Sequence, residues 1–393
     1  MRIEKIKSGI DRFKNILPKR FYGLRAGLLI HPASVNKKLV HTKNILLESK
    51  KVRIIALFGP QHGIFGNTQD NMIEWEGFVD KNTKIPVYSL YGKTRKPTAE
   101  MLKDIEIFII DLQDVGARYY TFIWTMALCI EACEEAEKPL VVLDRVNPIG
   151  GHLTEGPVLK PDFSSFVGLH HLPVRHGMTI GEIALYFKDN FYPKLDLTVI
   201  PLKGWKRNQW FDQTGLPWVM PSPNMPTLDT ATVYPGMCLF EGTIISEGRG
   251  TTRPFEIFGA SFIEPEKLVK RLKDFKLKGV IFRPLYFTPT FNKFSGELCG
   301  GAQIHVIDRE KFKPFKTAVA ILLAIHELYP EVNLWRQPPY EYEFEKLPFD
   351  ILSGSDRLRK NIEKGTPLKD IEDWWNEEVL AFEKVRNRYL LYE

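Results

Sequence analysis

Residues 105–114 read Ile105-Glu-Ile-Phe-Ile-Ile-Asp-Leu-Gln-Asp114, an apolar run that ends in acidic and amide side chains. An unbroken apolar run of this length, rich in β-branched residues, is typical of a strand buried on both faces of a parallel sheet. The first half of the chain holds four more such runs, at 25–31, 52–58, 87–91 and 139–144. Helical patterns separate them, at about 37–50, 98–103 and 120–137. This alternation predicts an α/β fold with a Rossmann-like parallel sheet and helices on both faces.

The same pattern continues to about residue 200. Thr179 and Glu182 have the spacing of a capping box, which predicts a helix over 179–190, and 196–201 reads as a further strand. From about 200 to 255 the chain is rich in turns. The prolines within 218–226 keep the residues before them extended, so we expect this stretch to cross the sheet edge without regular structure.

The last third of the chain predicts a smaller α+β unit. Its helices are expected near 265–275, 313–329 and from 371 onward, and its strands near 280–287 and 303–306. A chain of 393 residues exceeds one ordinary hydrophobic core. We therefore expect a Rossmann-like N-terminal domain over 1–239 and a C-terminal α+β domain over 240–393, with the active-site cleft between them.

Composition argues against several classes of partner. The 54 Lys and Arg residues exceed the 48 Asp and Glu residues by a mild +6, and no aromatic residues alternate with the lysines as nucleic-acid binding requires. No stretch approaches the roughly 18 apolar residues of a membrane span. The charged N-terminus lacks the apolar core of a signal peptide, so a cytoplasmic protein is expected. Neither nucleic acid nor a membrane is expected as a partner, and the oligomeric state stays open.

Polar residues cluster just after the predicted strands. The carboxyl ends of parallel strands share one edge of a sheet, which is where ligands of open α/β folds bind. We therefore expect one ligand-binding rim that gathers four polar clusters, at 58–63, 111–114, 144–147 and 175–177, which contain Gln61, His62, Asp111, Asp114, Asp144, Arg145, Asn147 and His176.

The densest chemistry lies in Phe240-Glu-Gly-Thr-Ile-Ile-Ser-Glu-Gly-Arg-Gly-Thr-Thr-Arg-Pro-Phe-Glu256. The run has no apolar stretch to bury, and its glycines let the backbone approach a ligand closely. Glu247 sits at its centre, and Arg249 and Arg253 are suited to bind a substrate carboxylate through paired hydrogen bonds. The run is therefore predicted to be an active-site loop.

The residues themselves leave three chemistries open. Nucleotide binding is the weakest, because no phosphate-binding glycine motif occurs where a strand leads into a helix. A metal hydrolase would draw its ligands from His62, Asp111, Asp114, Asp144 and His176. Glycoside hydrolysis needs two carboxyl groups. The candidates are Glu241, Glu247 and Glu256 in or beside the loop, and Glu74 and Glu76, between which Trp75 could stack on a sugar.

Six long motifs, in one order, resemble a known family. They are Pro60-Gln-His-Gly63, Asp111-Leu-Gln-Asp-Val-Gly-Ala-Arg-Tyr-Tyr-Thr121, Asp144-Arg-Val-Asn-Pro-Ile-Gly-Gly151, Arg175-His-Gly-Met-Thr-Ile-Gly-Glu182, Pro221-Ser-Pro-Asn-Met-Pro-Thr-Leu-Asp229 and the 240–256 loop. Together they are similar to the NamZ-like exo-β-N-acetylmuramidases of peptidoglycan turnover, formerly a domain of unknown function. The resemblance runs from about residue 20 to the end of the chain.

The resemblance implies a hydrolase that releases N-acetylmuramic acid from the non-reducing ends of cell-wall fragments, without a cofactor. The lactyl carboxylate of that sugar would pair with Arg249 or Arg253. The chain departs from the family at one motif: relatives usually have glutamate where this chain has Gln61, and the resemblance implies a catalytic role for that glutamate. Glutamine orients groups by hydrogen bonds but does not transfer a proton as a carboxylic acid does.

Together, these observations predict a cofactor-independent glycosidase that acts on a small glycan or muropeptide-like substrate. The expected catalytic residues are Glu247, as acid or base, with Gln61, His62, Asp114 and Glu74; the expected substrate-binding residues are Asp111, Arg118, Tyr120, Asp144, Arg145, Asn147, His176, Asn224, Arg249, Thr252 and Arg253. No metal ligand is assigned. The alternatives are a non-catalytic glycan-binding or regulatory protein, and a metal-dependent hydrolase that uses the strand-end Asp and His residues.

Overall fold

The apolar run that opens the 105–114 stretch forms β5 (Ile107–Asp111), every residue of which is buried in a seven-stranded sheet. A computed structural model describes residues 6–69 and 72–393. The sheet has the order β3-β4-β2-β1-β5-β6-β9. Its strands, besides β5, are β1 (Arg25–Ile30), β2 (Arg53–Gly59), β3 (Phe78–Val79), β4 (Pro86–Ser89), β6 (Leu140–Leu143) and β9 (Leu197–Ile200). All pairings are parallel except that of the short edge strand β3 with β4.

The two faces of β5 show why its sequence is continuously apolar. Ile107 and Ile109 pack into one core with α1 (Gly9–Ile16) and α2 (Thr42–Ser49), and the alternate residues Phe108 and Ile110 pack into the other. The second core contains residues of α3 (Ala99–Leu102), α4 (Phe122–Glu135) and α5 (Ile180–Phe191) and continues into the C-terminal third. A strand with helices over both faces buries every side chain, which confirms the predicted α/β fold.

The predicted capping box at the start of α5 is also confirmed. The Thr179 hydroxyl accepts a hydrogen bond from the Glu182 amide, and the Glu182 carboxylate accepts one from the Thr179 amide at 2.9 Å. A two-stranded antiparallel ribbon, β7 (Glu155–Val158) and β8 (Pro173–Arg175), precedes this helix. Short 3-10 turns lie at Lys19–Phe21, Pro161–Phe163, Phe211–Gln213 and Cys238–Gly242.

The C-terminal third is built on a three-stranded antiparallel sheet of order β10-β12-β11. These strands are β10 (Ile257–Ala260), β11 (Val280–Phe287) and β12 (Cys299–Val306), and the helices of this part are α7 (Pro265–Asp274), α8 (Pro314–Leu328), α9 (Pro348–Ser353) and α10 (Arg357–Glu363). Glycine is required on β12, because a Cβ at Gly301 would lie 1.9 Å from the Phe258 carbonyl oxygen. The predicted smaller α+β unit is therefore present.

One helix contradicts the prediction of an extended stretch from 200 to 255. α6 (Leu228–Met237) begins after Thr227, whose hydroxyl accepts from the Thr230 amide at 3.3 Å. The helix packs against α8, and a Cβ at Gly236 would lie 2.0 Å from the Pro314 carbonyl oxygen. Tertiary packing of a buried segment outweighs the local preference of its prolines and glycine for turns.

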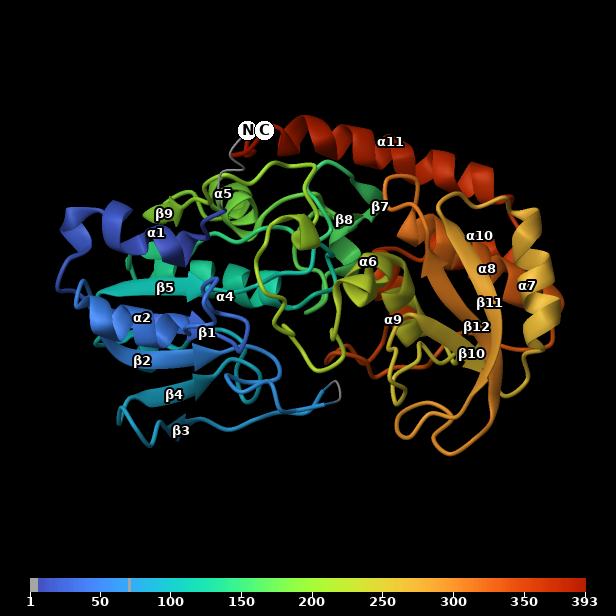
Figure 1. Cartoon of the computed structure of the whole chain (residues 1–393), viewed down its shortest axis with the longest axis horizontal. Coiled ribbons are helices and arrows are strands. Elements are labelled where there is room, and N and C mark those ends of the chain that lie inside the picture. Colours follow the sequence, from blue (N-terminus) through green and yellow to red (C-terminus); the bar gives the residue numbers. More distant parts are fainter. Residues whose placement is uncertain (1–5, 70–71) are drawn as a thin grey trace.

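The last helix, α11 (Leu368–Arg386), lies across both parts of the molecule and returns the end of the chain to the sheet unit (Figure 1). Trp374 and Trp375 are buried in its apolar stripe, as expected of core residues. Beyond the helix, the Tyr392 hydroxyl accepts from the Leu202 amide at 2.9 Å and donates to the Asp144 carboxylate. The four cysteines are buried free thiols, and no helix in the described ranges is long and apolar enough to cross a membrane.

Candidate active site

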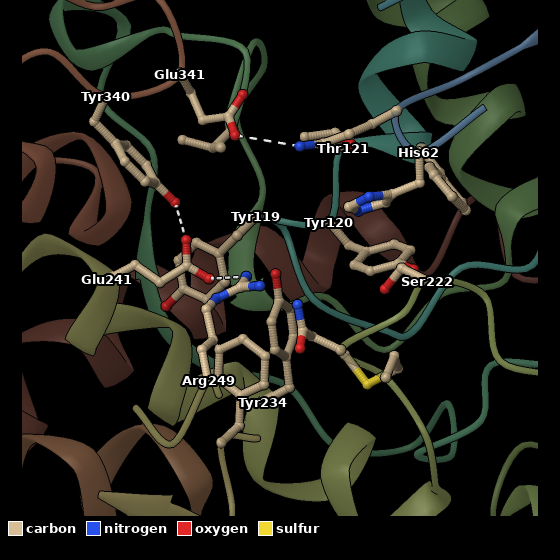
Figure 2. Close-up of a pocket in the computed structure, with 16 residues that line it drawn as sticks. His62, Tyr119, Tyr120, Thr121, Ser222, Tyr234, Glu241, Arg249, Tyr340 and Glu341 are labelled. Atoms are coloured by element: carbon tan, nitrogen blue, oxygen red, sulfur yellow. Dashed lines mark hydrogen bonds and ion pairs between the residues drawn. The ribbon is translucent and has the colours of Figure 1, made fainter. Parts of the chain in front are cut away.

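A narrow chamber of about 40 Å³ is lined by residues of both the sheet unit and the C-terminal third. Gln61 and His62 reach it from the loop after β2, and Tyr119 to Phe122 from the start of α4. The other side is formed by the segments before and after α6 and by the loop after α8. Figure 2 shows its side chains pointing into one space. The lining residues are Gln61, His62, Tyr119, Tyr120, Thr121, Phe122, Val167, Ser222, Asn224, Met225, Tyr234, Glu241, Arg249, Phe255, Tyr340 and Glu341.

A larger cavity of about 570 Å³ adjoins this chamber and shares Glu241, Arg249 and Tyr340 with it. The remaining residues of this outer cavity are Met72, Thr243, Ile244, Glu247, Asn292, Lys293, Phe294, Glu297 and Arg336. A few hundred Å³ is the usual size of a small-molecule site, whereas 40 Å³ holds only a few waters or one substituent. The two hollows thus form one site with a wide outer part and a narrow inner end.

Glu241 stands where the two hollows meet. One carboxylate oxygen accepts from the Arg249 guanidinium at 2.8 Å and the other from the Tyr340 hydroxyl at 2.5 Å (Figure 2). Burial opposes ionisation of Glu241, but the Arg249 charge and these hydrogen bonds outweigh it and hold its pKa below the ordinary value. The site therefore contains a buried carboxylate that stays negatively charged.

Glu341 is a second buried carboxyl group in the inner chamber. Unlike Glu241, it has no cationic hydrogen-bond partner in the part of the chain that the structure describes. Its oxygens accept from the Tyr91 hydroxyl at 2.8 Å and from the Gln61 side-chain amide at 3.3 Å. No ion pair is formed by Glu341 with any other described residue. Burial, with the nearby Glu241 charge, raises its pKa to about 7. Two carboxyl groups whose pKa values are moved apart by their surroundings are the arrangement that acid and base chemistry uses.

Gln61 is oriented by its neighbours. Its oxygen accepts from the Thr121 hydroxyl at 2.7 Å, which directs its NH₂ group toward Tyr91 at 3.1 Å and toward Glu341. The following residue, His62, has φ of 67° and donates from Nδ1 to the Thr68 carbonyl oxygen at 2.8 Å. The loop after β2 therefore presents both side chains to the chamber.

Glu247 lies in the outer cavity and does not line the inner chamber. Its carboxylate oxygens lie 3.3 Å from Arg249 Nε and 2.8 Å from Lys293 Nζ. Lys293 also donates to the carbonyl oxygens of Phe240 and Ile245. Glu247 thus fixes two cations at the wall of the site.

Several polar residues at the strand ends form hydrogen bonds within the protein and do not line the site. This differs from the expectation of one ligand-binding rim. Asp111, buried at the end of β5, accepts from Arg145 at 2.5 and 2.7 Å and also from Thr42. Asp144 accepts from the Gly181 amide at 2.7 Å and from the Thr179 hydroxyl at 2.9 Å. Internal partners occupy these polar groups, which is the packing reason for their clustering.

The same correction applies to residues near β8. Asp114 accepts from the Gly116 amide at 2.7 Å and lies 3.2 Å from His176 Nε2, and Asn147 donates to the Met178 carbonyl oxygen at 2.9 Å. Arg118 is wholly buried and donates to the carbonyl oxygens of Pro157, Leu172 and Leu352. All four side chains lie outside both hollows.

Some of the remaining predicted residues line the inner chamber, and others line neither hollow. Tyr120, Asn224 and Arg249 line the inner chamber. Glu74 is exposed and accepts from the Tyr342 hydroxyl at 3.0 Å, and Thr252 is exposed at the surface. The Arg253 side chain is 47% exposed and pairs with Glu256 at 3.1 Å. Glu74, Thr252 and Arg253 line neither hollow.

Glu341 was not among the residues predicted from the sequence, and Glu241 was one of several candidate carboxylates but was not assigned to the site. The signal for Glu341 lies in Pro339-Tyr-Glu-Tyr342, an aromatic and acidic run between two helices. As for metals, no group of three or more His, Cys, Asp or Glu side chains with the geometry of a metal site occurs within 6–69 and 72–393.

Comparison with known proteins gives the same family for both parts of the chain. The family models "Exo-beta-N-acetylmuramidase NamZ, N-terminal" and "Exo-beta-N-acetylmuramidase NamZ, C-terminal" match residues 26–229 and 232–392. The chain is 47% identical over 389 residues to the peptidoglycan beta-N-acetylmuramidase NamZ of Bacillus subtilis, covering 99% of this chain and 92% of the relative.

Two crystal structures of DUF1343 family proteins from Bacteroides fragilis share the fold. One is 36% identical with a TM-score of 0.89 and covers 100% of both chains. The other is 30% identical with a TM-score of 0.77 and covers 99% of both chains.

Proposed function

Because the chain belongs to the NamZ exo-β-N-acetylmuramidase family, we propose that it is a glycoside hydrolase that releases terminal N-acetylmuramic acid from the non-reducing ends of peptidoglycan-derived glycans. The observation that supports this most is the pair of buried carboxyl groups, Glu241 and Glu341, at the narrow inner end of the site. Glycoside hydrolysis uses one carboxyl group as an acid and another negatively charged group beside the anomeric carbon.

The shape of the site supports action at a chain end. The inner chamber is narrow, and it shares Glu241, Arg249 and Tyr340 with the wider outer cavity. Such a site suits a chain end, because its narrow inner part has room for one substituent of a sugar and not for a continuing glycan chain. The proposed substrate places its last sugar against Glu241 and its remaining part in the outer cavity.

A test of this proposal uses a chromogenic β-glycoside of N-acetylmuramic acid, with ligand binding measured alongside turnover. The expected result is steady release of the chromophore, unchanged by a chelator. Binding without release would favour a glycan-binding protein, and loss of release with chelator followed by recovery with a divalent ion would favour a metal hydrolase. The cytoplasmic location stays a prediction, which cell fractionation tests.

Arg336 is the proposed partner of the lactyl carboxylate. Arg249 already pairs with Glu241 and Glu247, and Arg253 lies outside both hollows. Arg336 lines the outer cavity and forms no ion pair with another described residue; its guanidinium lies 5.7 Å from the centre of the Tyr340 ring. A substrate carboxylate that enters the outer cavity therefore meets a cation without an acidic partner.

Arg336→Gln is expected to raise KM for the muramic acid glycoside about 10- to 100-fold, with a smaller change in kcat, since a hydrogen bond to a charged group is worth about 1.5–3 kcal/mol. The matching N-acetylglucosamine glycoside, which has no carboxylate, should show no such change in KM. Arg253→Gln is the control and should leave both values unaltered. A KM effect from Arg253→Gln alone would instead assign the carboxylate to Arg253.

A further inference from the structure

Glu341 lines the inner chamber but was not among the site residues predicted from the sequence. It is 3% exposed, lines the chamber wall, and faces Glu241 and Tyr340 across the space (Figure 2). Its backbone has φ of 45° and that of Tyr342 has φ of 67°, a left-handed conformation that residues other than glycine seldom adopt. Two such residues in succession at the wall of a site indicate that the loop is held in place to present the side chain.

Both hydrogen-bond partners of the Glu341 carboxyl group donate to it. The Gln61 NH₂ group is fixed as a donor because its oxygen is taken by Thr121. The Tyr91 hydroxyl donates at 2.8 Å while it accepts from Gln61 and from the Met72 amide at 3.1 and 3.2 Å. In the acid form of Glu341, neither partner therefore accepts the carboxyl proton. This proton is left to point into the chamber.

We propose that Glu341 is the proton donor of the hydrolase and that Gln61 is its positioning residue. The assignment rests on the proposed function. As the bond between the anomeric carbon and the glycosidic oxygen breaks, its electron pair stays on that oxygen, which takes the Glu341 proton. Water then adds its hydroxyl group to the anomeric carbon, and the proton that it loses restores the acid. Glu241 remains negatively charged beside the developing positive charge on the sugar.

Glutamine at position 61 suits this role better than glutamate does. A second carboxylate 3.3 Å from Glu341 would place two negative charges together, and the two groups would then titrate as a coupled pair. The amide removes that charge and supplies a hydrogen bond in its place. The chain thus has one carboxyl group at this contact, on residue 341 and not on residue 61.

The groups around Glu341 set its protonation near neutral pH. Burial is the largest cause and Glu241 adds to it, while Tyr91, Gln61 and Arg95 act in the opposite direction; together they raise the pKa of Glu341 to about 7. Tyr340 and Tyr342 flank it in the chain, and the pKa of each tyrosine is raised as well. The acid form is therefore present below about pH 7 and is lost as the pH rises through that value.

The test compares two substrates that differ in their leaving group. The disaccharide of N-acetylmuramic acid on N-acetylglucosamine needs protonation of the leaving oxygen, whereas a 4-nitrophenyl β-glycoside of N-acetylmuramic acid leaves readily without it. Glu341→Gln should lower kcat/KM about 10²- to 10⁴-fold on the disaccharide and much less on the nitrophenyl glycoside. The fall in activity above about pH 7 should disappear in this variant. Glu345→Gln, an exposed glutamate of the same loop, is the control and should behave as the unaltered protein.

The double variant Gln61→Glu with Glu341→Gln exchanges the carboxyl and amide groups across the same contact. It should recover part of the disaccharide activity, which loss of a merely structural glutamate would not allow. Three outcomes would overturn the assignment of Glu341 but leave the proposed function standing: equal losses on both substrates, no loss on either, or no recovery in the double variant. Inactivity of the unaltered protein on both substrates would overturn the proposed function and the assignment with it.

Discussion

Glu241→Gln is expected to lower kcat on muramic acid glycosides about 10²- to 10³-fold, the usual cost of removing one charge-stabilising group from an active site. Glu241 lines both hollows, and Arg249 and Tyr340 hold its pKa below the ordinary value against the effect of burial, so a negative charge lies where the proposed substrate places its last sugar. Glutamine has nearly the same shape but no charge. KM should change much less than kcat, because the charge matters most when the sugar becomes positive.

The comparison variant is Glu247→Gln. Glu247 is the carboxylate that the sequence favoured as the acid or base, but it lines only the outer cavity, whereas Glu241 stands where the two hollows meet. Its loss should therefore reduce kcat less than the loss of Glu241. Steady-state kinetics of both variants, with circular dichroism to show that they are folded, decide between the two residues. A larger loss for Glu247→Gln would contradict the present assignment.

Asp111→Asn is expected to destabilise the protein by about 3–5 kcal/mol, since it leaves a buried arginine without its carboxylate. Asp111 is wholly buried, accepts two hydrogen bonds from Arg145, and lies outside both hollows. Thermal or denaturant unfolding should show this loss. At temperatures where the variant stays folded, its kcat and KM should match those of the unaltered protein.

Asp104→Asn provides the control for this prediction. Asp104 is exposed and its oxygen lies 3.7 Å from Arg25, so removal of its charge should cost at most about 1 kcal/mol. The two outcomes separate a framework role from substrate binding. If Asp111→Asn raised KM strongly without lowering stability, the sequence-based expectation that Asp111 binds substrate would be right.

The architecture was largely predictable because its signals are local. In the run that ends at Asp111, the side chains that point to either face of the sheet are apolar. A strand of that kind needs helices on both faces of the sheet. The spacing of Thr179 and Glu182 is also a local signal, and it correctly predicted the start of α5. α6 was missed because its stability comes from its contact with α8, which the local sequence does not record.

The candidate site was predictable only in part. Gln61, His62 and Arg249 line the chamber, but Asp111 and Asp144 have the same polar character and the same place after a strand. What separates them is whether another part of the chain satisfies their hydrogen bonds. Glu341 meets Gln61 across 280 positions of sequence, and only the folded chain brings the two side chains together.

The most direct measurement uses two disaccharides that differ in which sugar occupies the non-reducing end. The purified protein is incubated with N-acetylmuramic acid linked to N-acetylglucosamine, and separately with the reverse arrangement, and the products are identified by mass spectrometry. The predicted result is release of N-acetylmuramic acid from the first disaccharide and no cleavage of the second. Cleavage of both disaccharides, or of neither by a folded protein, would contradict the assignment of an exo-acting muramidase.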